Sequence, residues 1–228
     1  NNKLISIRLP KQVKRIDNYA FAKCTNLEDV ESENVVHIGQ EAFYADVMLK
    51  KITWGDELRT IGQCAFYECE NITSIEFSDK LEAIGSHAFG ETGITQIPDI
   101  GKNVGIWSDI FAYSKWEEDQ NDDFIVINKS LQAYKGKKLN VAIPDGITVI
   151  SGAFDASVEN KEYPIKLKAV YIPTSVTTIE GCSFFDQGKV TVYIPASVTE
   201  IGIRSVECDD QPVDDSIFED PSSATIVT

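Results

Sequence analysis

The sequence of 228 residues is poor in the side chains that most often build reaction centres. It contains two histidines, His37 and His87, one methionine, and five cysteines without a Cys-x-x-Cys pair. Dispersed histidines and the missing Cys-x-x-Cys motif argue against a structural zinc site. The motifs of serine hydrolases, phosphate-binding loops and dinucleotide-binding folds are absent as well. We therefore predict no catalytic residues, no metal and no cofactor, and we expect the chain not to be an enzyme.

Long apolar runs and positive charge are also scarce. No segment approaches the roughly 20 apolar residues that a membrane helix needs, so we expect no membrane insertion. The chain has 21 Lys and Arg against 36 Asp and Glu, a net charge of −15 at pH 7. An acidic surface repels phosphate backbones and anionic lipids, which excludes nucleic acid as the expected partner. The chain starts at Asn1 without an apolar leader, and we expect it to be part of a longer protein.

A repeat with a period of 22 or 23 residues runs through most of the chain. Each of the first five units carries a Phe with an Ile five residues before it, and four of the five have Ala immediately before the Phe. These phenylalanines are Phe21, Phe43, Phe66, Phe89 and Phe111. The pattern resumes with Ile143-Pro144 and Phe154, then with Phe184, and finally with a unit in which Val206 replaces the Phe. About eight units share this phase, which is typical of stacked repeat proteins.

The spacing inside one unit predicts its local structure. Apolar and polar residues alternate in Ser6-Ile7-Arg8-Leu9, the pattern of a strand with one buried face. Gly39, Gly62 and Gly85 suit a tight bend before the Ala-Phe element. A unit of this size cannot enclose a core alone, so we predict a mainly β solenoid with strands in register about 4.8 Å apart.

The repeat resembles the BspA-like class of leucine-rich repeats, with its L-x-x-I-x-I-P-x-x-V-x-x-I-G-x-x-A-F-x-x-C pattern. The first unit follows the pattern from Leu4 to Cys24, except that Asp17 replaces the glycine, and the third follows it from Leu49 to Cys69. The resemblance implies a leucine-rich-repeat solenoid in a bacterial protein that is secreted or exposed on the cell surface. It also implies a role in adhesion to proteins or other cells.

The repeat is interrupted once, and its end is irregular. We predict one solenoid domain with a first repeat block at 4–111, an insertion at 112–138, a second block at 139–208 and a cap or tail at 209–228. Within the insertion, an acidic loop at 116–123 precedes a β-hairpin in which 124–127 and 131–134 flank a three-residue turn. The acidic loop lacks the spaced carboxylates of a calcium loop, and a solvated loop is favoured over a calcium site. A short loop at Val158–Pro164 lengthens the following unit.

The five cysteines are expected to be mostly free thiols. Cys24 and Cys69 share a repeat phase but lie two units apart, which is about 10 Å in a stack and too far for a disulfide. Only Cys182 and Cys208 lie in neighbouring units, and their phases differ. Buried thiols that pack as small hydrophobic side chains are the favoured interpretation.

Function is expected on the surface of the stack. Strand alternation points one residue of each unit outward at a fixed phase. These candidate binding residues are Arg8, Glu31, Thr53 and Glu76 in the first block and Tyr171 and Tyr193 in the second. We expect them to form a row that binds an extracellular protein or a glycan. Alternatively, the tyrosines only stabilise the sheet, and the chain is a structural spacer or, less consistently with its scattered carboxylates, a polysaccharide-acting enzyme.

Overall fold

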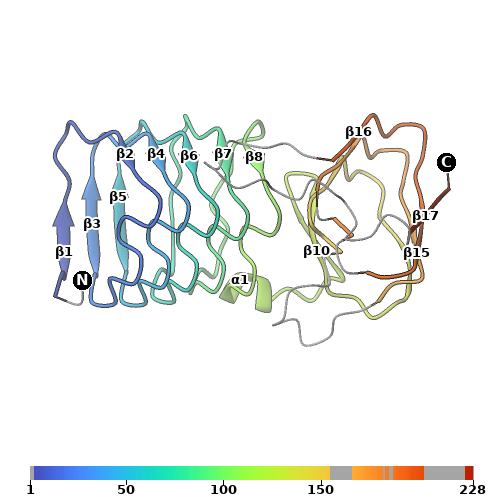
Figure 1. Cartoon of the computed structure of the whole chain (residues 1–228), viewed down its shortest axis with the longest axis horizontal. Helices are drawn as coiled ribbons and strands as arrows, with labels where there is room; N and C mark the ends of the chain where they lie inside the picture. Colours follow the sequence, from blue (N-terminus) through green and yellow to red (C-terminus); the bar gives the residue numbers. More distant parts are fainter. Residues whose placement is uncertain (1–2, 155–165, 182, 185–186, 203–223, 228) are drawn as a thin grey trace. The chain divides into compact units, whose positions relative to one another are not determined.

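The computed structural model of the chain is a β-solenoid of about eight turns, with almost no helix among the residues that it describes, which confirms the predicted fold. It describes residues 3–154, 166–181, 183–184, 187–202 and 224–227 (Figure 1). The chain forms two compact units, Asn1–Gln120 and Asn121–Thr228, which we describe separately as unit 1 and unit 2. The loop predicted at Val158–Pro164, the repeat position of Val206, and Cys182 and Cys208 lie outside the described residues.

Unit 1 is built on two parallel sheets whose strands pair at equal repeat phase. One sheet contains β1 (Ser6–Arg8), β3 (Asp29–Ser32) and β5 (Lys51–Trp54). The other contains the two-residue strands β2 (Arg15–Ile16), β4 (His37–Ile38), β6 (Thr60–Ile61), β7 (Ala83–Ile84) and β8 (Gly105–Ile106). Figure 1 shows the strands of the first sheet side by side at one end of the unit. Ile7 pairs with Val30 and Val30 with Ile52, so the predicted register is confirmed there.

The first sheet is shorter than the repeat predicts. The equivalent segments of the fourth and fifth units, around Ile75 and Ile97, form no strand. At the point where the ladder would continue, the indole N–H of Trp54 donates to the backbone carbonyl of Glu76 at 2.9 Å. The sheet ends at β5, and the side chain of Trp54 bonds to the backbone of the unit in which the next strand would lie.

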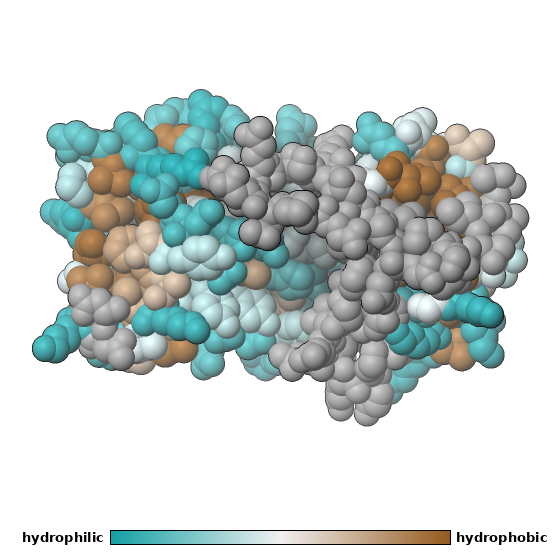
Figure 2. All heavy atoms as spheres, viewed as in Figure 1, coloured by the Kyte–Doolittle hydropathy of each residue, from teal (hydrophilic) through white to brown (hydrophobic). Residues whose placement is uncertain are grey.

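The core of unit 1 is a column of phenylalanine rings. Neighbouring rings from Phe21 to Phe111 stack with centroids 5.1–5.6 Å apart. Phe66 is fully buried, whereas Phe21 in the first coil is only partly buried. Figure 2 shows hydrophobic surface at the end of unit 1 that carries β1, where Ile5 is 61% exposed. The column is therefore well covered inside the stack and less well covered at its first coil.

The repeat glycines stand at the predicted bend, where the backbone N–H of Ala65 donates to the carbonyl of Gly62, but the bend is not what requires glycine. Gly39, Gly62 and Gly85 do not have positive φ; instead, a Cβ atom at Gly62 would lie 2.5 Å from the backbone of Gln40 and Gly39 in the preceding coil. Glycine is required there because two backbones approach closely. The left-handed residues of each coil are non-glycines two positions before and two positions after the Phe, such as Cys64 and Glu68.

A short helix ends unit 1, in a segment predicted as a solvated acidic loop. Helix α1 (Lys115–Glu118) is capped by the side chain of Ser114, which accepts from the backbone N–H of Glu117. Trp116 packs edge-on against Phe111 with ring centroids 5.9 Å apart, and Glu117 is buried. The prediction of a loop was therefore wrong at 116–118, where Trp116 packs on the last ring of the phenylalanine column. No helix in the described residues is long and apolar enough to cross a membrane.

Unit 2 also contains two sheets. One has the strand order β16-β14-β12-β10-β9, with β9 (Phe124–Ile127), β10 (Ser130–Tyr134), β12 (Val149–Ile150), β14 (Thr178–Ile179) and β16 (Glu200–Ile201). The other has the order β11-β13-β15-β17, with β11 (Asn140–Ala142), β13 (Ala169–Tyr171), β15 (Val190–Tyr193) and β17 (Ala224–Val227).

The predicted hairpin is present, with two corrections. Strand β10 begins at Ser130, so the turn has two residues, Asn128 and Lys129, both at positive φ as a type I′ turn requires. The hairpin is also part of the solenoid, because Leu131 pairs with Ile150 in a parallel ladder. In the segment predicted as a cap or tail, Ala224–Val227 forms β17 and extends the second sheet beyond β15.

Candidate binding surfaces

The first candidate surface is the outer side of the β1-β3-β5 sheet, which we call the charged face. Its six outward residues form two rows that the strand register fixes: Ser6, Asp29 and Lys51, and Arg8, Glu31 and Thr53. The structure therefore places three of the predicted residues in one row. Glu76 is exposed but lies outside the sheet, beside Trp54, so it does not extend the ladder.

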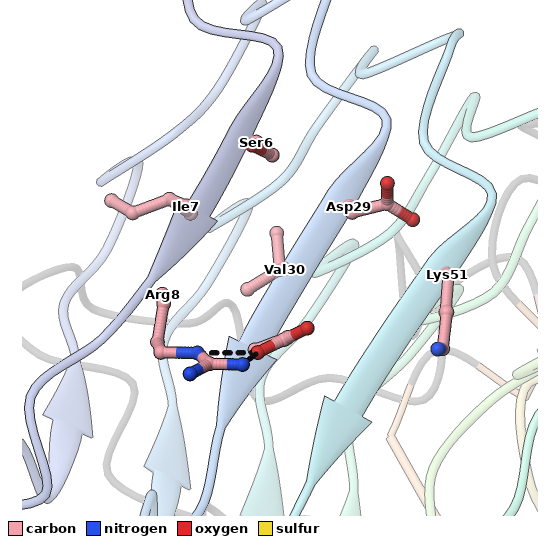
Figure 3. A pocket seen from close by; sticks show the side chains of 7 residues that line it. Ser6, Ile7, Arg8, Asp29, Val30 and Lys51 are labelled. Atoms are coloured by element: carbon pink, nitrogen blue, oxygen red, sulfur yellow. Dashed lines mark hydrogen bonds and ion pairs between the residues drawn. The ribbon is translucent and has the colours of Figure 1, made fainter.

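The charged face has a concavity in which two residues of opposite charge pair with each other. A concavity of about 320 Å³ lies over β1, β3 and Lys51 (Figure 3). Within it the guanidinium of Arg8 forms an ion pair with the carboxylate of Glu31, although 78% of the Arg8 side chain remains exposed. Exposed pairs of this kind contribute little to stability because water and salt screen them. The pair between Arg8 and Glu31 nevertheless engages part of the guanidinium that an anionic ligand would otherwise bind.

Ion pairs between neighbouring coils continue along unit 1. They are Lys11–Glu33, Lys50–Glu28, Arg59–Glu82 and Lys80–Glu57. The hydrogen bond from Lys11 lowers the pKa of Glu33, and the hydrogen bond from Lys80 lowers the pKa of Glu57. Each pair joins residues about one repeat apart. The charges of unit 1 therefore follow the stacking of its coils and do not converge on one point.

The second candidate surface is the outer side of β11, β13 and β15, which we call the tyrosine face. Register places Asn140, Ala169 and Thr191 in one row and Ala142, Tyr171 and Tyr193 in the next. The two tyrosine rings stack with centroids 4.5 Å apart and an interplanar angle of 6°. Tyr171 is 46% exposed and Tyr193 is 37% exposed. The predicted stacking of an outward tyrosine pair on adjacent coils is present in unit 2.

A buried polar column, missed by the sequence interpretation, lies three residues after each Phe of unit 1. Its members are Cys24, Asp46, Cys69, Thr92 and Ser114, all buried. Asp46 Oδ1 accepts from the backbone N–H of Cys24 at 2.6 Å, whereas Oδ2 has no partner among the described residues. Burial raises the pKa of Asp46 from 3.8 to about 7, and the bond from Cys24 opposes that rise. The sequence contained a signal for this column, because Cys24 and Cys69 share a repeat phase. Asp46 has the same phase in the coil that lies between them.

The three described cysteines are free thiols, as the sequence predicts. Cys24 and Cys69 are buried, and Cys64 is partly buried. The thiol of Cys69 donates to the carbonyl of Phe43, which fixes it inside the stack. Burial raises the pKa of Cys64 to about 12, and the nearby charge of Glu41 adds to the rise. Burial also raises the pKa of Cys69, so the thiols of Cys64 and Cys69 stay protonated near neutral pH and are poor nucleophiles.

Polar side chains outside this column bond mainly between coils. Tyr44 donates to Glu68 at 2.9 Å, which is the main cause of a rise in the Tyr44 pKa to about 12. Tyr67 donates to Glu91 at 2.6 Å in the same way one coil later. His37 Nδ1 lies 2.9 Å from the hydroxyl of Thr60, in the structural role expected for a lone histidine. Among the described residues, no group of three or more His, Cys, Asp or Glu side chains is placed to hold a metal ion.

Comparison with known proteins gives a consistent family and fold. The family described as BspA type leucine rich repeat region matches residues 1–117 and 157–210 in six copies. A leucine-rich repeat protein from Bacteroides ovatus is 21% identical over 91% of this chain and 62% of its own, with a TM-score of 0.52. One from Eubacterium ventriosum is 21% identical over 88% of this chain and 56% of its own, with a TM-score of 0.51. This chain thus spans less than two thirds of either structure. No curated protein matches the sequence.

Proposed function

The chain belongs to the BspA-type leucine-rich repeat family, and from that premise we propose that it is a non-catalytic binding module of a bacterial extracellular or cell-surface protein. Its ligand would be an extracellular protein or a glycan. Repeat stacks display the same phase on successive coils and so present extended surfaces to partners. The observation that carries the proposal is the exposed, stacked pair of Tyr171 and Tyr193 on the tyrosine face.

The two surfaces differ in what they leave available to a ligand. On the charged face, Arg8 and Glu31 already pair with each other. On the tyrosine face, neither tyrosine hydroxyl makes a hydrogen bond with a described residue. Exposed aromatic rings supply contact area at a small cost in side-chain entropy and are enriched among residues that dominate binding. We therefore place the ligand-binding surface on unit 2.

Paired arrays of extracellular-matrix proteins and glycans test the proposal directly. We expect the full chain to bind at least one ligand without chemically changing it. The double variant Tyr171→Ser/Tyr193→Ser should weaken that binding and keep the melting temperature within a few degrees. The matched variant Arg8→Ser/Glu31→Ser, which alters the charged face, should bind like the unchanged chain.

Each rival function predicts a different result on the same arrays. A structural spacer would bind nothing, and a polysaccharide-acting enzyme would release shortened sugars from a bound glycan. If the tyrosine variant binds with unchanged affinity, the pair serves only sheet packing and the binding surface lies elsewhere. If the variant unfolds, the pair is likewise a packing element, and our assignment is wrong.

A further inference from the structure

We infer that the tyrosine face binds an uncharged glycan, with a sugar ring stacked on the outer face of Tyr171 above Ala142. This inference rests on the proposed binding function and specifies its ligand. Three features of the face favour such a ligand: its charge, the shape around Tyr171, and the polar groups beside it.

The tyrosine face lacks charge in a chain that is rich in it. The strands β11, β13, β15 and β17 contain no Asp, Glu, Lys or Arg. By contrast, the three strands of the charged face contain Arg8, Asp29, Glu31 and Lys51. The nearest cations in sequence are Lys138, Lys168 and Lys189, which precede β11, β13 and β15 by one or two residues, at the opposite end of these strands from Ala142, Tyr171 and Tyr193. A face without fixed cations, in a chain of net charge −15, disfavours sulfated or carboxylated ligands and favours a neutral one.

The shape around Tyr171 leaves one ring face available. Ala142 on β11, Tyr171 on β13 and Tyr193 on β15 share one register position. Tyr193 covers one face of the Tyr171 ring, because the two rings are nearly parallel at 4.5 Å. On the opposite side Ala142 contributes only a methyl group, and both Ala142 and Tyr171 are exposed. The outer face of the Tyr171 ring therefore stands beside a lower area of the surface formed by Ala142. We call this area the step.

That step suits the apolar face of a pyranose. The π-face of an aromatic ring is electron-rich, so it attracts the weakly positive C–H groups of a sugar ring that stacks on it. Neighbouring strands lie about 4.8 Å apart, so a ring above Ala142 would sit at stacking distance from Tyr171. Peptide chains can also stack on tyrosine, but standard protein interfaces bury about 800 Å² on each partner. On this face the exposed large hydrophobic residues are Tyr171 and Tyr193, with Leu139 just before β11. This small apolar area favours the sugar.

Hydrogen-bonding groups flank the step at the next position along the strands. Asn140 on β11 and Thr191 on β15 occupy the row beside the tyrosines, on either side of the buried Ala169. Neither side chain makes a hydrogen bond with a described residue. An amide and a hydroxyl can donate to and accept from sugar hydroxyls. The rows lie about 7 Å apart along the strands, so a sugar stacked above Ala142 brings its hydroxyl groups within reach of Asn140.

Calorimetric titration of the full chain with neutral and acidic oligosaccharides tests the inference. The probes are cellohexaose, mannohexaose and a galacturonic acid hexamer. Tyr171→Leu removes the ring but keeps apolar bulk, and Ala142→Leu fills the step without touching the tyrosines. We expect the unchanged chain to bind a neutral hexasaccharide and both variants to raise its Kd at least tenfold, about 1.4 kcal/mol. Tyr171→Trp should keep the affinity within about threefold, because it restores a ring face.

The control is Tyr19→Leu, which removes a tyrosine that is 54% exposed on unit 1 and should leave the Kd unchanged. Unchanged affinity in Ala142→Leu would overturn the inference, as would tighter binding of the galacturonic acid hexamer than of the neutral probes. If neither neutral probe binds but a matrix protein does, and serine replacement of both tyrosines weakens it, the inference fails and the proposed function stands. If no protein and no glycan binds, both fail.

Discussion

At the scale of single residues, Asp46 makes stability depend on pH in an unusual direction. Its carboxyl is fully buried in the polar column, and burial raises its pKa from 3.8 to about 7. Between these values the folded state holds a proton that the unfolded state has released. The free energy of unfolding therefore falls as pH rises from about 4 to about 7, and it is highest, as far as this group is concerned, below pH 3.8.

Asp46→Asn should remove this contribution, because the amide keeps an acceptor for the backbone N–H of Cys24 and does not ionise. We expect the melting temperature of the variant to rise relative to that of the unchanged chain as pH increases from 4 to 8. Thermal unfolding of both proteins across that range provides the measurement. At each pH, subtracting the melting temperature of the unchanged chain from that of the variant cancels the contribution of the surface carboxylates, which both proteins share. A difference that does not change with pH would show that Asp46 ionises freely in the folded state.

The phenylalanine column predicts a graded cost of truncation. Phe66 is fully buried between the rings of Phe43 and Phe89, so Phe66→Ala should lower the free energy of unfolding by about 3–5 kcal/mol. Phe21 is partly buried and stacks only on Phe43, so Phe21→Ala should cost less. Urea denaturation of the two variants checks the order. Equal losses would mean that the first coil is packed as tightly as the third.

The thiols provide a second test of the interior. Thiol titration without reductant should find at least three of the five cysteines reactive in denaturant, since Cys24, Cys64 and Cys69 are free. Under native conditions Cys24 and Cys69 should react slowly, because both are buried. Rapid labelling of the folded protein at either position would contradict the packing of the polar column.

At the scale of elements, the repeat glycines hold neighbouring coils at close distance. Gly62→Ala would bring a Cβ within 2.5 Å of the backbone of Gln40 and Gly39, which cannot yield as a side chain does. We expect a loss of about 1–3 kcal/mol in the free energy of unfolding. Gly101→Ala is the matched control, because its Cβ would meet only the Val104 side chain at 3.6 Å. Similar stabilities for the two variants would mean that the close approach of the two backbones does not require glycine at position 62.

Sequence reasoning predicted the elements that depend on repeat phase. The positions of Phe66, Ile61 and Tyr171 follow from a fixed repeat period, and that period can be read directly from the order of residues in the sequence. The reason for Gly62 did not follow, because the approach of two backbones involves residues a full coil away. Helix α1 was missed because the three acidic residues at 117–119 indicate an exposed loop. In the structure, the packing of Trp116 on Phe111 holds this segment against the core instead. For the binding residues, phase predicted the tyrosine pair but not the end of the first sheet at β5, beyond which the Trp54 indole bonds to the backbone of Glu76.

At the scale of the whole molecule, the two units carry different surface chemistry on the same repeat. The charged face of unit 1 presents mixed charge, with Arg8 and Glu31 paired between coils, and the tyrosine face of unit 2 presents aromatic and uncharged polar groups. Binding to fixed charges weakens as salt shortens the screening length, from about 10 Å at 0.1 M to about 3 Å at 1 M. Binding through ring stacking and neutral hydrogen bonds does not depend on charge. The two faces therefore make opposite predictions for the effect of salt.

The measurement that most directly tests the central claim, that ligand is bound on the uncharged tyrosine face, is the salt dependence of affinity. The Kd of the best ligand found on the arrays is measured at about 0.1 M and about 1 M sodium chloride. We expect it to change less than about twofold, because no charged side chain lies in the strands of that face. A Kd that rises tenfold or more at high salt would instead place the ligand on the paired charges of unit 1 and contradict the account.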